Sequence, residues 1–268
     1  PKLLAKLELE DNDYILSRVN YYNKMVDNKP IDDASSVLLY DFVLKNYQSA
    51  YFFDTYEYTR YFSEQFRISP LFGDITHVPI VPSITKSRPI KGDNSNSVLL
   101  NLDKARHFTF VKDNKNFTDK LNILIGRANV KQPHRIRFME MYFNHPMCNL
   151  GQINKSNAHP EWHTRLISID EHLDYKFILC LEGYDVATNL KWVMSSNSLA
   201  VMPKPKYETW YMEGTLIPDY HYVCIKDDYS DLEARLNYYI NDPDEAQFII
   251  DNAHKHVAQF QNQLREDL

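Results

Sequence analysis

The second half of this chain alternates short, almost wholly apolar runs with segments of helical periodicity, and this alternation restricts the possible folds most. Continuous apolar runs are typical of strands that are buried on both faces of a sheet. Strands that alternate with helices form a parallel sheet with right-handed crossovers, whose ligands bind at the carboxyl ends of the strands. The pattern therefore predicts an α/β fold. The predicted strands are residues 121–125, 176–181, 198–202 and 221–225.

Helices are predicted between these strands and at the end of the chain. Ser230 and Glu233 have the spacing of a capping box, in which each side chain bonds to the backbone amide of the other residue. Asp242 is expected to cap the last helix, with Pro243 at its first position. The predicted helical segments are residues 134–143, 188–197, 207–212 (a single turn), 232–240 and 244 onward.

The first half, through about residue 115, is polar and rich in aromatic residues. Mostly apolar residues recur at helical spacing over residues 14–22 and 37–45. The four prolines from Pro70 to Pro89 prevent a long helix, so extended segments and turns are expected there. Residues 97–102 are predicted to form a further buried strand.

Composition excludes several classes of protein. A net charge of −6 and an isoelectric point near 5.9 leave no basic excess for binding nucleic acid. The three widely spaced cysteines have neither a zinc-site spacing nor the pattern of a disulfide framework. No signal peptide and no apolar stretch of about 18 residues is visible. We therefore expect a cytoplasmic protein whose contact with a membrane, where it occurs, is peripheral.

Two loops that follow predicted strands, residues 126–135 and 183–191, carry groups able to bind an anion. The second loop leads into a short helix, whose unpaired amides also attract anions. Because both loops follow strands of one sheet, together they predict a diphosphate site. A solvated loop and a simple helix cap are the alternatives for either loop alone. The candidate groups are Gly126, Arg127, Lys131, His134 and Arg135 in the first loop, and Thr188, Asn189 and Lys191 in the second.

Tyr207 and Glu208 follow the strand at residues 198–202 and a Pro-Lys-Pro turn. A carboxylate beyond a strand end can bind the diol of a ribose, as acids do in dinucleotide-binding folds. Glu208 is therefore a candidate ribose contact with Tyr207 beside it. A surface acid in a short helix is the alternative.

In the first half, Asp74 lies in a turn among apolar residues. Partial burial makes a carboxylate a stronger base, so Asp74 is a candidate general base. His77 is a second candidate base or donor, and Lys86 and Arg88 are expected to hold an anionic acceptor. A Gly-Asp pair is also common in ordinary turns, which is the alternative interpretation.

No metal site is predicted. Residues 11–13 have the Asp-x-Asp spelling of a known metal-binding motif, but they precede a helical pattern and follow no buried strand. We therefore interpret them as the start of a helix. His159, His163 and His172 lie in one polar stretch without the spacing of metal ligands, and they are expected to be surface or packing residues.

Together these features resemble glycosyltransferase family 90, which contains capsule-associated xylosyltransferases, animal protein O-glucosyltransferases and bacterial lipopolysaccharide glycosyltransferases. The resemblance is strongest over residues 175–240 and is closest to the bacterial members. This segment keeps the family's order of a strand ending in Gly, a short helix, a Ser-Leu strand, a Glu-aromatic turn, a Pro-x-x-His-Tyr segment and an Asp-Leu helix. Residues 70–140 match more loosely, and residues 1–65 hardly at all.

The resemblance implies a GT-B fold, in which two Rossmann-like domains face a cleft and the last helix crosses back to the first domain. Residues 1–115 would form the acceptor-side domain and residues 116–243 the domain that binds the nucleotide sugar. Residues 244–268 would form the final helix that packs on the first domain.

The resemblance also implies the chemistry. An inverting, metal-independent enzyme would move glucose or galactose from a UDP-sugar to a hydroxyl of the lipopolysaccharide core, with no cofactor besides this co-substrate. Asp74 matches the family's general base, Gly126 with Arg135 its phosphate loop, and Glu208 its ribose-side acid.

One position departs from the family's pattern, because Asn189 stands where eukaryotic members usually have Arg. The phosphates are then expected to rely on Arg135, Lys191 and helix amides. Two other functions stay open: a non-catalytic module of this fold that binds glycans or nucleotide sugars, and a phosphotransferase acting on the same glycolipid. The phosphotransferase ranks last, because neither a Walker loop nor a kinase Asp-Asn set is visible.

Overall fold

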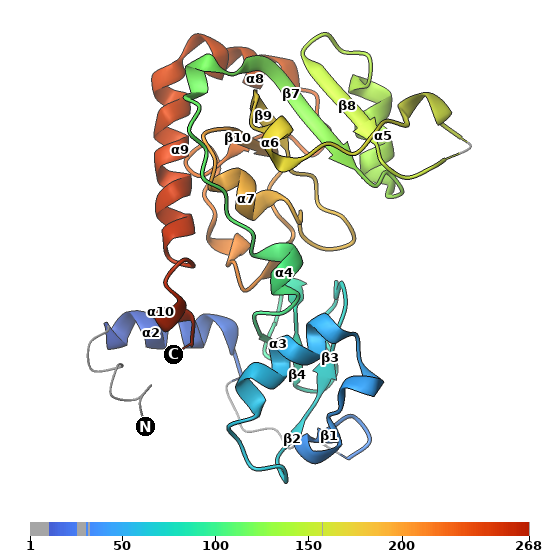
Figure 1. The fold of residues 1–268 in the computed structure, drawn as a ribbon, viewed down its shortest axis with the longest axis vertical. Helices are drawn as coiled ribbons and strands as arrows, with labels where there is room; N and C mark the ends of the chain where they lie inside the picture. The colour runs from blue at the N-terminus through green and yellow to red at the C-terminus, as the bar shows by residue number, and fades with distance from the viewer. Residues whose placement is uncertain (1–10, 26–30, 32, 157, 268) are drawn as a thin grey trace.

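The computed structural model describes residues 11–25, 31, 33–156 and 158–267. The chain forms two parts, drawn one above the other in Figure 1, with the later residues in the upper part. Helix α4 (Lys104–His107) and the extended segment after it carry the chain from the lower part to the upper one. Among the described residues, no helix has both the length and the apolar character needed to cross a bilayer.

The upper part is built around a five-stranded parallel sheet in the order β12-β10-β9-β7-β8. Numbered along the chain, this is the 2-1-3-4-5 order of a doubly wound α/β fold, in which the direction of winding reverses between the first and third strands. Those two strands are β7 and β9, which pair directly. The five strands are β7 (Leu121–Ala128), β8 (Cys148–Gln152), β9 (Tyr175–Leu179), β10 (Leu199–Met202) and β12 (Val223–Cys224).

Both faces of this sheet are buried. Leu124, Phe177 and Val201 belong to one core, which is shared with α5 and α8. Their neighbours Ile125 and Ile178 belong to a second core, which is shared with α7 and the later turns of α9. Strands covered on both sides need continuous apolar sequence, which explains the pattern seen in the chain. The helices of this part are α5 (Pro133–Tyr142), α6 (Ile169–His172), α7 (Leu190–Met194), α8 (Leu232–Asn241) and α9 (Pro243–Ala258).

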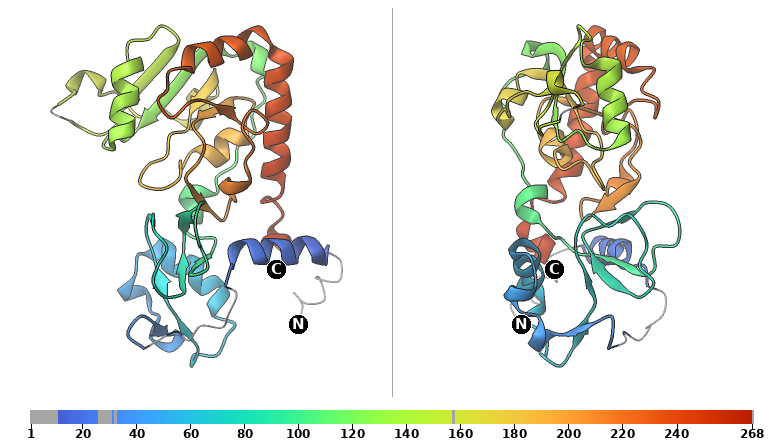
Figure 2. Two further views of the ribbon diagram at one scale, coloured as in Figure 1. Left: turned by 180° about the vertical axis from the view of Figure 1, so that it is seen from behind. Right: turned by 90° about the vertical axis from the view of Figure 1, so that its right-hand side faces the viewer.

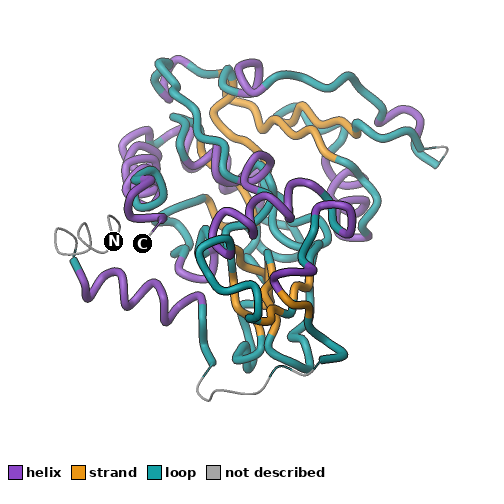
Figure 3. The backbone as a smooth tube through the Cα atoms, turned by 60° about the horizontal axis from the view of Figure 1, so that its bottom comes forward, coloured by secondary structure: helices purple, strands orange, loops and turns teal. Residues whose placement is uncertain are grey.

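The lower part contains a smaller, three-stranded parallel sheet in the order β3-β4-β6, and Figure 3 shows the strands of both parts in one view. Aromatic rings fill the space beside helix α3, where Phe52 stacks on Phe42 and Tyr51 stacks on Phe72. The α/β class is confirmed, whereas the GT-B arrangement remains a prediction. The elements are α2 (Asn12–Tyr22), β1 (Val37–Leu38), α3 (Ser49–Thr59), β2 (Arg67–Ile68), β3 (Pro70–Leu71), β4 (Ser83–Thr85) and β6 (Ser97–Leu99).

Two features connect the parts. Strand β5 (Ser87–Pro89) pairs antiparallel with β11 (Tyr207–Thr209) from the second half of the chain. Helix α9 descends toward the lower part, and α10 (Gln263–Asp267) then lies against α2, as both views of Figure 2 show. There Arg18 of α2 pairs with Glu266, and the indole of Trp210 donates to the same carboxylate at 2.5 Å. The end of the described chain therefore contacts its first described helix.

Two of the predicted helical segments are wrong. Residues 37–45 form β1 and two short 3-10 helices, Leu39–Asp41 and Leu44–Asn46. The predicted turn at residues 207–212 begins with strand β11 instead. In both cases the strand forms because it pairs with a distant segment, β2 or β5, and a local pattern carries no signal of that partner.

Side chains at the helix starts test the predicted caps. Asp11 accepts hydrogen bonds from the amides at the start of α2, and Asp242 accepts one from the start of α9, so both caps are confirmed. The interpretation of residues 11–13 as a helix start is confirmed with them. The capping box of Ser230 and Glu233 is wrong, because the Ser230 hydroxyl donates to Asp228 instead.

Candidate functional site

A pocket of about 450 Å³ opens at the carboxyl ends of β7 and β9, where the winding of the sheet reverses. Ligands of open α/β sheets bind at this switch point. One wall of the pocket is the segment after β7, residues 129–132, with the start of α5. The other wall is the loop after β9, residues 181–189. Asp74, from the lower part, and Arg106, from the crossover, also line the pocket.

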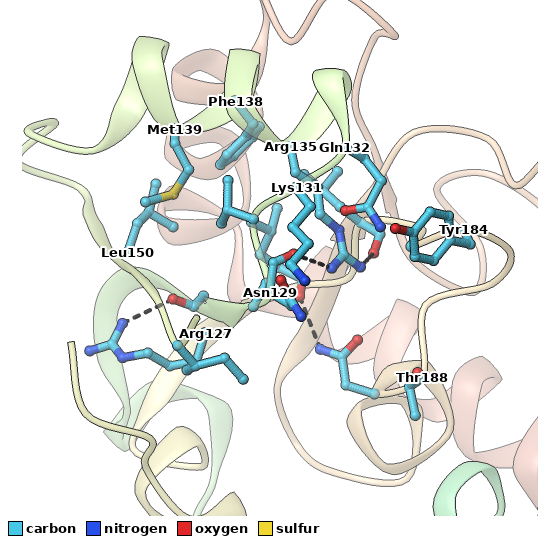
Figure 4. Close-up of a pocket in the computed structure, with 18 of the residues that line it drawn as sticks. Arg127, Asn129, Lys131, Gln132, Arg135, Phe138, Met139, Leu150, Tyr184 and Thr188 are labelled. Atoms are coloured by element: carbon cyan, nitrogen blue, oxygen red, sulfur yellow. Dashed lines mark hydrogen bonds between the residues drawn. The ribbon is translucent and has the colours of Figure 1, made fainter. Parts of the chain in front are cut away.

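Arg135 joins the two walls, as Figure 4 shows. Its guanidinium donates to the carbonyls of Asn129 at 2.9 Å, Glu182 at 2.9 Å and Leu181 at 2.7 Å. Burial lowers the pKa of Arg135, but a guanidinium remains charged in proteins. The pocket therefore contains a cation whose position is fixed by backbone carbonyls.

Arg127 and Lys131 add two further positive charges to the lining. Lys131 is exposed and lies beside Gln132 in Figure 4, whereas Arg127 turns toward β8 and donates to Asn149 at 2.8 Å. Within the described parts of the chain, no carboxylate lies within 4.0 Å of the cationic groups of these residues or of Arg135. Three cations without an acidic partner favour an anionic ligand.

Asp74 reaches the same pocket from the lower part. Lys86 Nζ lies 2.5 Å from Asp74 Oδ1 and 2.9 Å from Asp185 Oδ2. Burial acts to lower the pKa of Lys86, but the charge of Asp185 and the hydrogen bond to Asp74 outweigh burial and raise that pKa, so the ammonium group stays charged. The structure thus brings the predicted base and the predicted phosphate loop together, and it pairs Lys86 with the base rather than exposing it to an acceptor.

The loop after β9 contributes two of its three predicted residues. Thr188 and Asn189 both line the pocket, although the side-chain amide of Asn189 donates to the carbonyl of Leu179 at 3.0 Å. Lys191 does not reach the pocket, because it is fully buried and paired with Glu213 at 2.6 Å. The helix that contains Lys191, α7, is only five residues long.

Arg88 and Glu208 lie away from the pocket. They form an ion pair of 2.8 Å between side chains that are 0% and 1% exposed, and the hydroxyl of Tyr21 donates to the same carboxylate. Both are interior ion-pair residues without exposed surface in this structure, which therefore gives no support to the expected contacts of Arg88 with an acceptor and of Glu208 with a ribose. His77 is exposed and lies outside the lining of the pocket.

Tyr207 lines a second pocket, which shares the loop after β9 with the first. Glu182 also lines this second pocket, and its carboxylate accepts hydrogen bonds from the amides of Lys206 at 2.8 Å and Tyr207 at 3.1 Å. Burial raises the pKa of Glu182 to about 7, despite these donors. The second pocket therefore contains a carboxyl group that changes its charge near neutral pH.

Gly126 is needed for the packing of the sheet beneath the pocket. A Cβ atom at this position would lie 2.9 Å from the side chain of Leu150 and 3.1 Å from that of Leu179. At Gly183, a Cβ atom would lie 3.4 Å from the guanidinium of Arg135. The contact at Gly183 would be an ordinary van der Waals contact, whereas Gly126 leaves room for two leucines that line the pocket.

Sequence reasoning missed several residues that line the pocket. Tyr184 and Asp185 directly follow Gly183 in a loop that was already predicted to bind an anion, so their position was the available signal. Arg106 lies in α4, in the crossover between the two parts, where no local pattern indicates a site.

The described residues contain no group of three or more His, Cys, Asp or Glu side chains that could hold a metal ion. His159 stacks on Trp162 with 3.7 Å between ring centroids. His172 is buried and forms a 2.7 Å hydrogen bond with the carbonyl of Ser168. The expected packing roles of these two histidines are confirmed.

Comparison with known proteins identifies the class. The model of Glycosyl transferase family 90 matches residues 103–267. This span includes the whole five-stranded sheet and all the residues that line the pocket except Asp74. The chain is a glycosyltransferase, and it belongs to glycosyltransferase family 90.

A curated relative extends the similarity to most of the chain. The O-glucosyltransferase LpsA of Dichelobacter nodosus is 42% identical over 246 residues, which cover 92% of this chain and 77% of the relative. Coverage of this extent reaches into the first 65 residues. The family model itself begins at residue 103, so residues 1–65 lie outside it.

Proposed function

We propose that this enzyme transfers a hexose from a UDP-sugar to a hydroxyl of the lipopolysaccharide core, with inversion at the anomeric carbon and without a metal ion. Glucose is favoured over galactose, because the similar protein of D. nodosus is named an O-glucosyltransferase. The core acceptor follows from the resemblance to bacterial lipopolysaccharide members of the family. Such an acceptor would place the enzyme on the cytoplasmic face of the inner membrane.

One observation carries the proposal: Asp74 and three cations without acidic partners line the same pocket. Asp74 comes from the lower part, whereas the cations come from β7, the segment after it and α5. Direct glycosyl transfer needs a base beside the acceptor hydroxyl and positive charge beside the departing diphosphate. The pocket is lined by both, the carboxylate from the lower part and the cations from the upper part.

The proposed reaction is a single displacement. Asp74 takes the proton from the acceptor hydroxyl while the oxygen of that hydroxyl attacks the anomeric carbon of the donor. The bond between that carbon and the diphosphate oxygen breaks, its electron pair leaves with UDP, and the configuration inverts. Arg135 and Lys131 stabilise the negative charge that develops on the diphosphate.

The remaining lining residues have supporting roles in this proposal. Thr188 and Asn189 are placed to bond the phosphates or the sugar from the other wall. The cations take over the charge neutralisation that a divalent metal supplies in other transferases, which is the basis for proposing metal independence. Lining from two parts of the molecule is also what supports the GT-B arrangement.

The test is the variant Asp74→Asn, measured for glucosyl transfer and for UDP binding. We expect transfer to fall by about 10²- to 10⁴-fold, the usual contribution of a general base, while the Kd for UDP stays nearly unchanged. Asp41→Asn, at an exposed position of the lower part, is the control and should retain full activity. Turnover at the wild-type rate in Asp74→Asn would remove Asp74 from the mechanism.

A further inference from the structure

Lys86 lies between two carboxylates that come from different parts of the molecule. Its Nζ atom contacts Asp74 Oδ1 at 2.5 Å and Asp185 Oδ2 at 2.9 Å. The side chains of Lys86 and Asp185 are 1% and 3% exposed, whereas that of Asp74 is 30% exposed. The row of charges therefore runs from the interior to the pocket and ends at the proposed base.

The residue next to Lys86 holds the backbone of the same turn. The hydroxyl of Ser87 accepts a hydrogen bond from the amide of Ile75 at 3.1 Å and donates to the carbonyl of Ile75 at 3.0 Å. Ile75 directly follows Asp74. Lys86 and Ser87 therefore fix, respectively, the carboxylate of Asp74 and the backbone beside it. Ser87 is itself fixed by the pairing of β5 with β11.

Asp185 belongs to the loop after β9, which forms the donor-side wall of the pocket. The carbonyl of Asp185 accepts a hydrogen bond from the amide of Gly183 at 3.1 Å, which closes a tight turn in this loop. Thr188, three residues further on, lines the pocket. The ion pair with Lys86 therefore ties this wall to the turn that contains Asp74.

Stability alone does not account for a lysine in this place. Burying charged groups requires their desolvation, and a buried ion pair seldom stabilises a protein more than apolar residues of similar volume would. Lys86 also bonds only to Oδ1 of Asp74, and in the described part of the chain Oδ2 has no hydrogen-bond partner. This arrangement leaves Oδ2 available to accept a proton.

We infer that Lys86 is a positioning residue, which orients the carboxylate of Asp74 toward the acceptor and connects it through Asp185 to the donor-side loop. The inference rests on the proposed role of Asp74 as the base. The sequence predicts that Lys86 binds the acceptor. A positioning role explains why Lys86 is instead buried against Asp74 and Asp185. It assigns Asp185 a role in coupling the two walls of the pocket.

The test compares the steady-state kinetics of Lys86→Met and Lys86→Arg, with UDP-glucose and truncated lipopolysaccharide core as substrates. We expect Lys86→Met to lower kcat by about 10²-fold, as misplacement of a catalytic group does, and Lys86→Arg to recover part of the loss. The KM for UDP-glucose should change by less than about threefold, because the group acts on the chemical step. Folded sites are counted by titration with UDP.

Lys120 provides a matched control. It is also buried and paired with a carboxylate, Asp113 at 2.6 Å, but neither residue lines the pocket. Lys120→Met should lose stability and keep kcat per folded site. Asp185→Asn keeps the pair of Lys86 with Asp74. This variant replaces Lys86→Met in the test if Lys86→Met does not fold. We expect it to lower kcat by roughly tenfold, because the connection to the donor-side loop is lost.

The outcomes separate the inference from the proposed function. If folded Lys86→Met keeps the wild-type kcat while Asp74→Asn is inactive, the positioning role is overturned and the base assignment stands. Equal losses of kcat in Lys86→Met and Lys120→Met would overturn it as well. Full activity of Asp74→Asn would overturn the base assignment together with this inference.

Discussion

Arg88 of β5 and Glu208 of β11 face each other as register partners across the antiparallel ribbon that joins the two parts of the molecule, and their side chains form a fully buried ion pair of 2.8 Å. Three further hydrogen bonds of Arg88 go to the backbone carbonyls of Tyr21, Tyr22 and Ser97. The pair therefore fixes how the first described helix and the ribbon meet.

Replacing Arg88 should destabilise the protein before it affects any substrate. Arg88→Met leaves the carboxylate of Glu208 buried without its main partner, which typically costs about 3–5 kcal/mol in the free energy of unfolding. Urea denaturation measures this loss, with the acceptor KM of the folded fraction as the control. A variant of wild-type stability with a raised acceptor KM would instead support the acceptor contact expected from the sequence.

Lys131 and Arg135 should contribute to donor binding in different ways. Lys131→Ala removes an exposed charge, and we expect about a fivefold higher donor KM, corresponding to roughly 1 kcal/mol, with an unchanged Tm. Arg135→Met also removes the bonds to three carbonyls, so both the donor affinity and the Tm should fall. Lys112→Ala, at an exposed position outside the pocket, is the control for charge. Equal donor KM values in all three variants and the wild type would contradict the diphosphate site.

Glu182 should make stability depend on pH. Burial raises its pKa from 4.5 to about 7, so the folded state holds this proton more tightly than the unfolded state does. The stabilisation from this proton is complete below about pH 4.5 and is lost as the pH rises through about 7. The loss in the free energy of unfolding is at most about 3 kcal/mol. Urea denaturation of Glu182→Gln and the wild type at pH 5 and pH 8 should show a smaller decrease in the variant. A decrease of the same size in both proteins would rule out this carboxyl group as the cause.

The strands and the loops after them could be predicted from the sequence, because their signals are local. The apolar run at residues 176–181 requires burial on both faces, and the structure places β9 at the centre of the sheet. The cations after β7 were predicted to share a site with Thr188, since parallel strands end at one edge, and one pocket contains them. The caps at Asp11 and Asp242 are local chemistry as well.

The pairings that the sequence did not indicate join residues distant in the chain. Glu208 looked like a ligand-binding acid because nothing near it in the sequence indicates Arg88, its partner across the ribbon. Lys191 likewise looked available, since its partner Glu213 belongs to a segment beyond the next two strands. A charged side chain that follows a strand can serve the pocket or the interior, and only the three-dimensional pairing decides between them.

The most direct test of the account is acceptor-dependent release of UDP, measured with UDP-glucose and with UDP-galactose on truncated lipopolysaccharide core in excess EDTA. The account predicts release from UDP-glucose that requires the core acceptor, is insensitive to EDTA and disappears in Asp74→Asn. Release abolished by EDTA would contradict metal independence. No release with either donor on any core acceptor, with UDP binding intact, would contradict the proposed transfer and favour a non-catalytic module that binds nucleotide sugars.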